Sequence, residues 1–265
     1  SMCIPGTALS RYVNFYTDYA FKKFFGTEAN KDLLISFLNS LFDFDETTKI
    51  EDVTYLNSEQ LGANINERRA IYDVYCKTKN GERFIVEMQN ARQEYFSDRA
   101  IYYSSFAIQE QGKKGARNGW DYRLSPVYVV GILNFKLSET LGFKDWEDEE
   151  EKVVARVNLK DEKNRNFSDK LNFIFLEMPK FRKEEAELKT FMDKWLYVIK
   201  NLDRLTKMPE TLVEAVFKKL FEVAEIAAFT KDERGKYEES LKNYLDCNNV
   251  LDTAKNEGRA EGEKA

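Results

Sequence analysis

One segment of the chain, residues 69–90, alternates apolar and polar residues in two short runs separated by a turn. Asp73 lies inside the first run and Glu87 inside the second. A two-residue period is typical of β-strands, and Asn80-Gly81 between the runs predicts a hairpin. A charged side chain among apolar neighbours is costly to bury unless it is paired or binds a cation. Two such acids on adjacent strands therefore indicate a carboxylate metal site on a hairpin.

The length of the turn decides whether the two acids meet. A two-residue loop puts Asp73 and Glu87 on opposite faces of the sheet, because a shift of one residue in register turns every side chain over. A three-residue loop, Lys79-Asn80-Gly81, places Asp73 directly opposite Glu87, with the glycine in the left-handed conformation. The metal site requires this loop or an equivalent bulge. The alternative is an ordinary half-exposed hairpin with surface acids, and spacing alone leaves both interpretations open.

Several short motifs in a fixed order resemble a known nuclease family. Asp73, separated by thirteen residues from Glu87-Met88-Gln89, is similar to the PD-(D/E)xK nuclease motif in its Asp…Glu-x-Gln variant. The motifs around it resemble the Rpn-type family of recombination-promoting nucleases and transposases in that superfamily. They are Asp18-x-x-Phe21-Lys22-x-x-Phe25-Gly26, Phe37-Leu38-Asn39, Arg99-x-x-x-Tyr103 and Tyr122-x-x-x-Pro126-Val127. The resemblance covers about residues 11–137, half of the chain.

The resemblance implies an α/β fold with a restriction-endonuclease-like mixed sheet core flanked by helices, followed by a helical C-terminal region. We expect a nuclease-like domain over residues 11–180 and a helical region over residues 181–265. The residue pattern agrees with strands and helices around one sheet. It predicts strands at 50–57, 126–135, 153–159 and 171–177, helices within 12–40 and at 95–111, a charged loop at 160–169, and helices from about 183 onwards.

In the functional interpretation the chain is a metal-dependent endonuclease that hydrolyses DNA. Asp73 and Glu87 are the expected ligands of Mg²⁺ or Mn²⁺, because hard cations prefer carboxylate oxygens. Gln89 stands where related nucleases carry lysine, so it can orient water but supplies no positive charge. Asp18 is a further candidate for the catalytic site, or it caps its own helix. The family resemblance also implies a link to recombination or transposition.

The charge of the chain gives weak support to nucleic-acid binding, because its net charge is −5. Residues 99–136 nevertheless hold six basic and two acidic residues. Trp120 or Tyr122 could stack on bases beside them, or the segment is a solvated loop with a core aromatic. Tyr102 and Tyr103 are expected in the core. The candidate nucleic-acid contacts are Lys22, Lys23, Arg99, Lys113, Lys114 and Arg117.

Composition excludes several classes of chemistry for this chain. It has no histidine, so a Ser-His-Asp triad, a Cys-His pair and a HExxH metal site are absent from it. It has no GxxxxGK[ST] or GxGxxG motif, and no nucleotide cofactor is expected. No apolar run approaches the roughly 20 residues that cross a bilayer, so no membrane association is expected. Three scattered cysteines and the lack of a signal-like N-terminal segment favour the cytoplasm.

The helical C-terminal region suggests a second interpretation. Its apolar helical faces pack internally or partly form a homodimer, since a nuclease that cuts both strands benefits from two sites. The competing function is a catalytically decayed nuclease fold that acts as a DNA-binding or protein-interaction module. Glutamine in place of lysine at Gln89 and the acidic net charge favour it, whereas the presence of Asp73, Glu87 and Gln89 together favours the enzyme.

Overall fold

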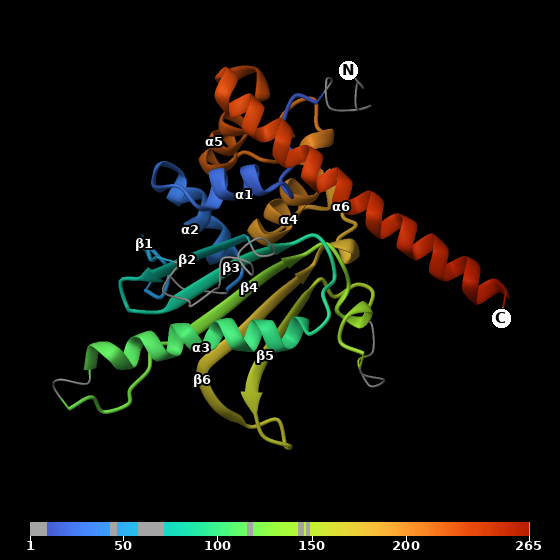
Figure 1. Cartoon of the computed structure of the whole chain (residues 1–265). Helices are drawn as coiled ribbons and strands as arrows, with labels where there is room; N and C mark the ends of the chain where they lie inside the picture. The colour runs from blue at the N-terminus through green and yellow to red at the C-terminus, as the bar shows by residue number, and fades with distance from the viewer. Residues whose placement is uncertain are drawn as a thin grey trace. The chain divides into compact units, whose positions relative to one another are not determined.

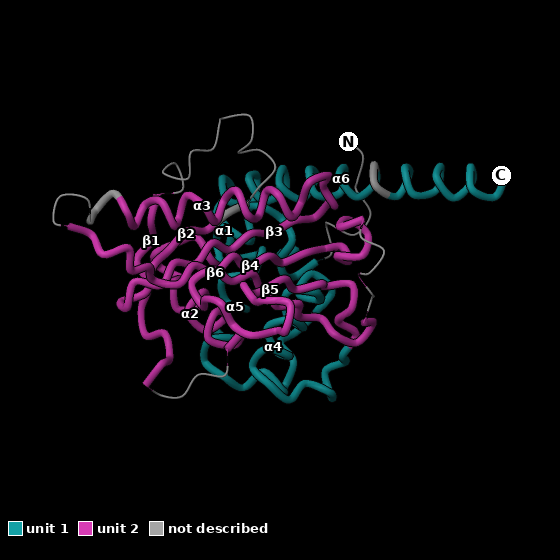
Figure 2. The backbone as a smooth tube through the Cα atoms, turned by 90° about the horizontal axis from the view of Figure 1, so that it is seen from below, with its two compact units in different colours: residues 1–24, 183–265 teal, residues 25–182 magenta. Residues whose placement is uncertain are grey.

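The computed structural model describes residues 10–42, 47–57, 72–115, 119–142, 146 and 149–264. The chain divides into two compact units, which Figure 2 distinguishes by colour. One unit comprises residues 25–182, and the other joins residues 1–24 to residues 183–265. The predicted division of the chain at residues 180/181 into two domains stays a prediction.

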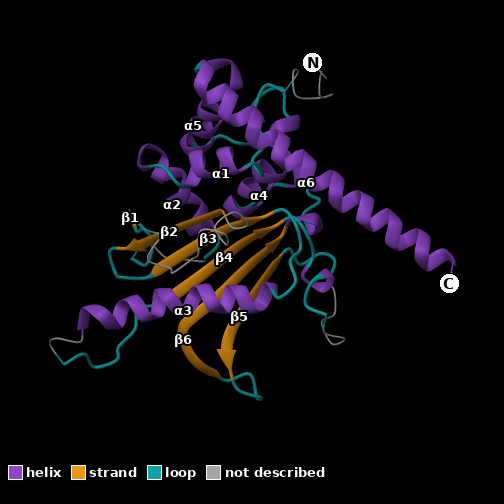
Figure 3. Ribbon diagram, in the orientation of Figure 1, coloured by secondary structure: helices purple, strands orange, loops and turns teal. Residues whose placement is uncertain are grey.

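The unit of residues 25–182 contains the sheet. Within the described residues the sheet has six strands in the order β1-β2-β3-β4-β6-β5 (Figure 3). The strands β1, β2 and β3 are antiparallel, β3, β4 and β6 are parallel neighbours, and β5 pairs antiparallel with β6 at the edge. The strands are β1 (Val53–Tyr55), β2 (Tyr72–Thr78), β3 (Arg83–Gln89), β4 (Val127–Leu133), β5 (Val154–Lys160) and β6 (Asn166–Glu177).

Two helices cover opposite faces of this mixed sheet (Figures 1 and 2). They are α2 (Lys31–Ser40) and α3 (Phe96–Gly115), and α3 makes the crossover that joins the parallel strands β3 and β4. A mixed sheet with flanking helices and a helical C-terminal segment is the restriction-endonuclease-like α/β fold that the sequence predicted. The fold-class prediction is confirmed.

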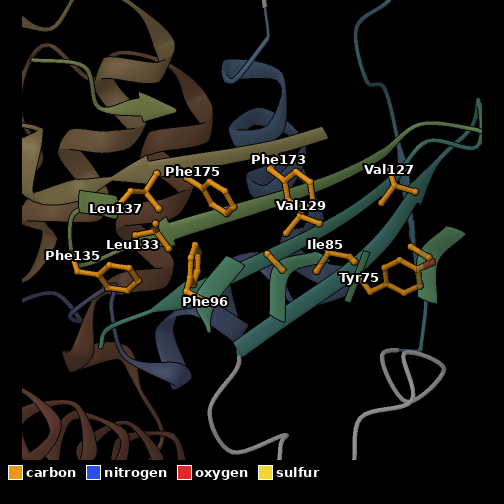
Figure 4. Packing of buried hydrophobic residues seen from close by; sticks show 12 residues of the cluster. Tyr75, Ile85, Phe96, Val127, Val129, Leu133, Phe135, Leu137, Phe173 and Phe175 are labelled. Carbon is orange, nitrogen blue, oxygen red and sulfur yellow. The ribbon is translucent and has the colours of Figure 1, made fainter. Parts of the chain in front are cut away.

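The face of the sheet under α3 is an apolar cluster (Figure 4). Phe96 of α3 packs edge-on against Phe175 of β6 and Phe135 after β4, with ring centroids 5.2 and 5.7 Å apart. The alternation of β3 and β4 contributes Ile85, Val129 and Leu133 to the same face. On the α2 face, the ring of Phe84 stacks on Tyr128 at 4.8 Å and meets Phe42 edge-on. The central strand β3 is buried along its whole length.

The predicted charged loop at residues 160–169 is wrong in its second half, because β6 begins at Asn166. Asp161 closes a tighter turn than expected: its Oδ1 accepts the backbone N–H groups of Lys163 and Arg165 at 2.9 and 2.8 Å. Asn164 takes the left-handed conformation with φ 62°. This local hydrogen bonding lets β5 and β6 continue to the turn, so Lys160 pairs with Asn166.

The second unit holds the helices α4 (Phe191–Asn201), α5 (Ala215–Ala224) and α6 (Lys231–Lys264), with most of α1 (Asp18–Phe25). The helical prediction for residues 12–40 is wrong at its start, because Tyr12 forms an isolated antiparallel bridge with Glu225. Arg11 secures this bridge through a 2.8 Å ion pair to Glu225. The N-terminal segment therefore belongs to the packing of the C-terminal helices, a contact that spans more than 200 residues of sequence and leaves no local signal.

The tight packing around β4 generates a stability prediction. Gly131 pairs with Phe175, and a Cβ built on it would lie 2.9 Å from Cδ1 of that buried ring. Gly131→Ala should lower the free energy of unfolding by about 1–3 kcal/mol, because overpacking forces the ring or the backbone to move. Urea denaturation measures this cost. In a Phe175→Leu background the same substitution should cost clearly less, and an equal cost in both backgrounds would contradict the packing argument.

Candidate active site

The hairpin that carries the two acids closes with the three-residue loop. The N–H of Thr78 donates to the carbonyl of Glu82 at 2.9 Å, and the N–H of Gly81 donates to the carbonyl of Thr78 at 3.0 Å. Gly81 has φ 91°, the left-handed region that glycine adopts without steric cost. Of the two loop lengths that the sequence left open, the structure therefore has the three-residue loop Lys79-Asn80-Gly81.

This loop sets the register of the two strands so that Asp73 pairs directly with Glu87. Residues opposite each other in an antiparallel pair lie on the same face of a sheet with their Cβ atoms about 4.5–5.5 Å apart. The position of Asp73 in the backbone is thus the one that a shared metal site requires. The side chain of Asp73 lies outside the described residues, so the distance between the two carboxylates stays a prediction.

Glu87 and Gln89 lie in the buried part of β3. Their exposed fractions are 2% and 3%, and Nε2 of Gln89 donates to Oε2 of Glu87 at 3.2 Å. An ionised carboxylate only accepts hydrogen bonds, which fixes the amide of Gln89 with its NH₂ group towards Glu87. The amide oxygen, Oε1, is buried and accepts no hydrogen bond from the described residues. The alternative of an ordinary half-exposed hairpin with surface acids is wrong for Glu87.

The sheet register explains how a carboxylate fits in this position. Glu87 follows Ile85 at the two-residue period, so it lies on the α3 face, and its neighbour in β4 is Gly131. A glycine there leaves that face of β4 without a side chain, and Phe175 occupies the next strand. The surroundings are apolar, where the effective dielectric is low and a charge interacts strongly with a ligand.

The residues fit a hard divalent cation. Mg²⁺ binds through one or two carboxylates and keeps several waters, so Asp73 and Glu87 supply enough protein ligands. Within the part of the chain that the structure describes, no group of three or more acidic or cysteine side chains is arranged to hold a metal ion. The candidate metal site therefore consists of the Asp73–Glu87 pair, with Gln89 bound to one of its carboxylates.

The candidates Asp18, Lys22 and Lys23 lie on α1 in the other unit. Lys22 forms a 3.0 Å ion pair with Asp18 one turn earlier. The helix cap that was the alternative role of Asp18 is supplied by Thr17, whose Oγ1 accepts the N–H of Ala20 at 3.2 Å. A role of Asp18 at the metal site stays a prediction.

Lys23 is occupied by contacts within its own unit. Its ammonium lies 2.8 Å from the carboxylate of Glu233 and 4.1 Å from the ring centre of Phe229. The hydrogen bond from Lys23 is the main reason why the pKa of Glu233 falls to about 2. A nucleic-acid role for Lys23 stays a prediction, and it would have to compete with this ion pair.

The candidate nucleic-acid contacts of the sheet unit lie along α3 and the loop after it. Arg99 donates to Oε1 of Gln93 and lies 6.0 Å from the ring centre of Tyr103. The side chains of Lys113 and Lys114, in the last turn of α3, and all of Arg117 lie outside the described residues. Their role stays a prediction.

The aromatic residues near α3 divide into core and surface. Tyr103 is buried as predicted, whereas Tyr102 is 53% exposed and its core prediction is wrong. Tyr102 lies one helical position, about 100°, away from Tyr103, which is enough to turn it from the sheet to solvent. Trp120 covers Gly112 and lies 4.8 Å from the exposed ring of Tyr122, so these two rings form one aromatic pair.

The sequence interpretation missed a second polar site at the end of β6. Glu177 and Lys180 form a 2.9 Å ion pair whose side chains are both 3% exposed, beside a cavity of about 300 Å³. Trp146, Lys152 and Arg156 also line this cavity. The available signal was an acid at the end of the apolar run of residues 171–177, the same type of signal that identified Glu87.

Comparison with known proteins agrees with this arrangement. The model of the PD-(D/E)XK nuclease family transposase matches residues 15–254, which include every candidate site residue named above. The chain belongs to this family. No curated protein and no solved structure matches it.

None of the helices that the structure describes is both long and apolar enough to cross a membrane.

The turn generates a test of the site's register. A Cβ added to Gly81 would lie 2.8 Å from Oγ of Ser125. An L-residue at this position would also have to adopt the unfavourable φ of 91°. Gly81→Ala should lower the free energy of unfolding by more than the roughly 1–2 kcal/mol of left-handed strain alone. Gly119→Ala is the matched control, because Gly119 has φ 71° and no atom within 4 Å of its added Cβ. Equal losses in urea denaturation would show that the contact with Ser125 is unimportant.

Proposed function

We propose that the chain is a metal-dependent nuclease that hydrolyses phosphodiester bonds of DNA, with Asp73 and Glu87 as the metal ligands. One observation carries the proposal: the three-residue loop pairs Asp73 directly with Glu87, in a family whose name-giving motif, PD-(D/E)XK, contains two acids. A pair of acids at adjacent positions in a buried sheet opposes folding, because like charges repel and burial disfavours ionisation. A bound cation relieves both costs, which gives the pairing a function.

The chemistry that Mg²⁺ or Mn²⁺ supplies in such a site, when bound, is activation of water at neutral pH and neutralisation of charge on the phosphate. The protein's own contribution is orientation. The amide of Gln89 holds one oxygen of Glu87 in place through the 3.2 Å hydrogen bond. Its Oε1, which accepts no hydrogen bond from the described residues, is available to accept a hydrogen bond from a water molecule. Gln89 is therefore the residue that positions the attacking water.

Several finer features belong to the same proposal. A role in transposition is supported by the family description. Cleavage within DNA strands and a link to recombination rest on the motif resemblance given above. The absence of a bound nucleotide cofactor, a cytoplasmic location and a homodimer that brings two sites to one duplex follow from the sequence features given above. Cleavage assays on circular, linear and single-stranded DNA with Mg²⁺, Mn²⁺ or EDTA test the substrate and the metal together.

The acid pair predicts a loss of activity without a loss of folding. Asp73→Asn or Glu87→Gln should lower the rate of metal-dependent cleavage roughly 100-fold or more. The melting temperature should not fall, because removal of one of two close carboxylates relieves repulsion. Glu51→Gln is the matched control: this acid is 72% exposed and its ion pair among the described residues is with Lys79. The control variant should cleave at the wild-type rate. Full cleavage by either site variant would exclude these residues as the active site.

Variants of Gln89 distinguish an active nuclease from a catalytically decayed one. Gln89→Ala should lower the cleavage rate while metal affinity, measured by calorimetry, stays nearly unchanged, since the carboxylates carry most of the binding. Gln89→Lys should retain or raise activity, because it restores a cation beside the phosphate. A wild-type protein that cleaves no nucleic acid, together with a Gln89→Lys variant that does, would favour a binding module with a decayed site. If neither cleaves and no cation binds, the enzyme proposal fails.

A further inference from the structure

The second polar site of the sheet unit has the features of a ligand pocket. Its cavity of about 300 Å³ has room for roughly ten water molecules and reaches the lower end of the range for small-molecule sites. Glu177 and Lys180 line one side, Lys152 and Arg156 supply further charge, and Trp146 supplies an aromatic wall. The cavity is thus larger than a single inorganic anion needs.

Both oxygens of the Glu177 carboxylate in the buried ion pair have hydrogen-bond partners. Oε2 of Glu177 accepts from Lys180 at 2.9 Å, and its Oε1 accepts the N–H of Leu137 at 2.8 Å. Both carboxylate oxygens are satisfied within the protein, and the ammonium of Lys180 is balanced by the same carboxylate. The Glu177–Lys180 pair therefore shapes the cavity and leaves its electrostatics to the other residues.

Arg156 and Lys152 supply positive charge that no described carboxylate neutralises. The guanidinium of Arg156 donates to the carbonyl of Leu41 and lies 6.0 Å from the ring centre of Phe42, and it forms no ion pair with a described residue. Partial burial lowers the pKa of Arg156. Lys152 also has no ion pair with a described residue. Among the described residues of the lining, Glu149 is the one further acid, so the described cations outnumber the described carboxylates there.

The register of the sheet places this cavity beside the candidate active site. Gln89 pairs with Leu133 of β4, and Leu133 pairs with Glu177 of β6. Neighbouring strands are about 4.8 Å apart, so the backbones of Gln89 and Glu177 lie about 10 Å apart at the same end of the parallel strands. The two residues also share a face of the sheet, because both belong to the same register row.

We propose that this cavity binds a nucleoside monophosphate unit, with the phosphate on Lys152 and Arg156 and the base against Trp146. Arginine and lysine recognise phosphate through charge-assisted hydrogen bonds, and an aromatic side chain binds any base by stacking. The unit is the phosphate-bearing end of a nucleic-acid strand or a free nucleotide, which share this chemistry. The strand end goes beyond the proposed nuclease function: Glu177 in the wall of the cavity lies two strands, about 10 Å, from Gln89.

Binding of end-labelled oligonucleotides in EDTA tests the proposal without cleavage. Fluorescence anisotropy compares one single strand with a 5′-phosphate, a 3′-phosphate or no terminal phosphate. A terminal phosphate at one end should strengthen binding about ten-fold. Arg156→Gln and Lys152→Gln should each remove most of this difference. Lys160→Gln, an equal loss of charge on the same strand β5 outside the cavity lining, should keep it.

The role of Trp146 has its own comparison. Trp146→Leu should weaken binding about five-fold or more when the terminal nucleotide carries a base, and should have no effect on an abasic end with the same phosphate. Thermal melting of each variant verifies that it is folded. Binding that does not depend on a terminal phosphate, or that depends on it equally in Arg156→Gln and Lys152→Gln, would overturn the proposal.

Competition separates the two sources of the ligand. A free nucleoside monophosphate that displaces the phosphorylated strand supports a nucleotide site, whereas failure to compete, with the end effect retained, supports strand-end recognition. Inorganic phosphate that competes as well as the nucleotide would overturn the role of the base. Repeating the measurement in Glu87→Gln keeps the two proposals separate, because the end effect should persist there whether or not the acid pair is the site of cleavage.

Discussion

The burial of the Glu87 carboxylate in the central strand is the constraint on which the rest of the sheet unit depends. A charge at 2% exposure is tolerated only if its surroundings are arranged for it. The three-residue loop brings Asp73 opposite, the amide of Gln89 binds one carboxylate oxygen, and Gly131 leaves space on the neighbouring strand. Each of these features would weaken an ordinary core, and together they support the proposed cation site.

The same end of the parallel strands carries both polar sites. β3 ends in Gln89 and β6 ends in Glu177, at one level of the register. Ligands of open α/β sheets bind outside the carboxyl ends of strands, because there the chain leaves the apolar core and polar side chains converge. The two buried carboxylates differ in their contacts. Glu177 forms an ion pair with Lys180, whereas Glu87 accepts a hydrogen bond from the amide of Gln89.

The elements with strong local patterns were predictable, and those fixed by distant contacts were not. The hairpin followed from alternation and Asn80-Gly81, and the buried strand of residues 127–133 followed from its apolar run. The start of β6 was missed because side-chain hydrogen bonds from Asp161 tighten a turn whose composition reads as a loop. The bridge between Tyr12 and Glu225 was missed because its partner lies at the other end of the chain.

The sequence by itself determined the candidate acids, their hairpin and the length of loop that lets them meet, because strand period and turn chemistry are local. The ordered motifs determined the family, which the family model confirms over residues 15–254. Tertiary structure decided which of the two loop lengths occurs and that Glu87 is buried. It alone revealed the cavity with Arg156 and Lys180, since those residues meet only when β5 and β6 pair and the chain beyond β6 turns back on the sheet.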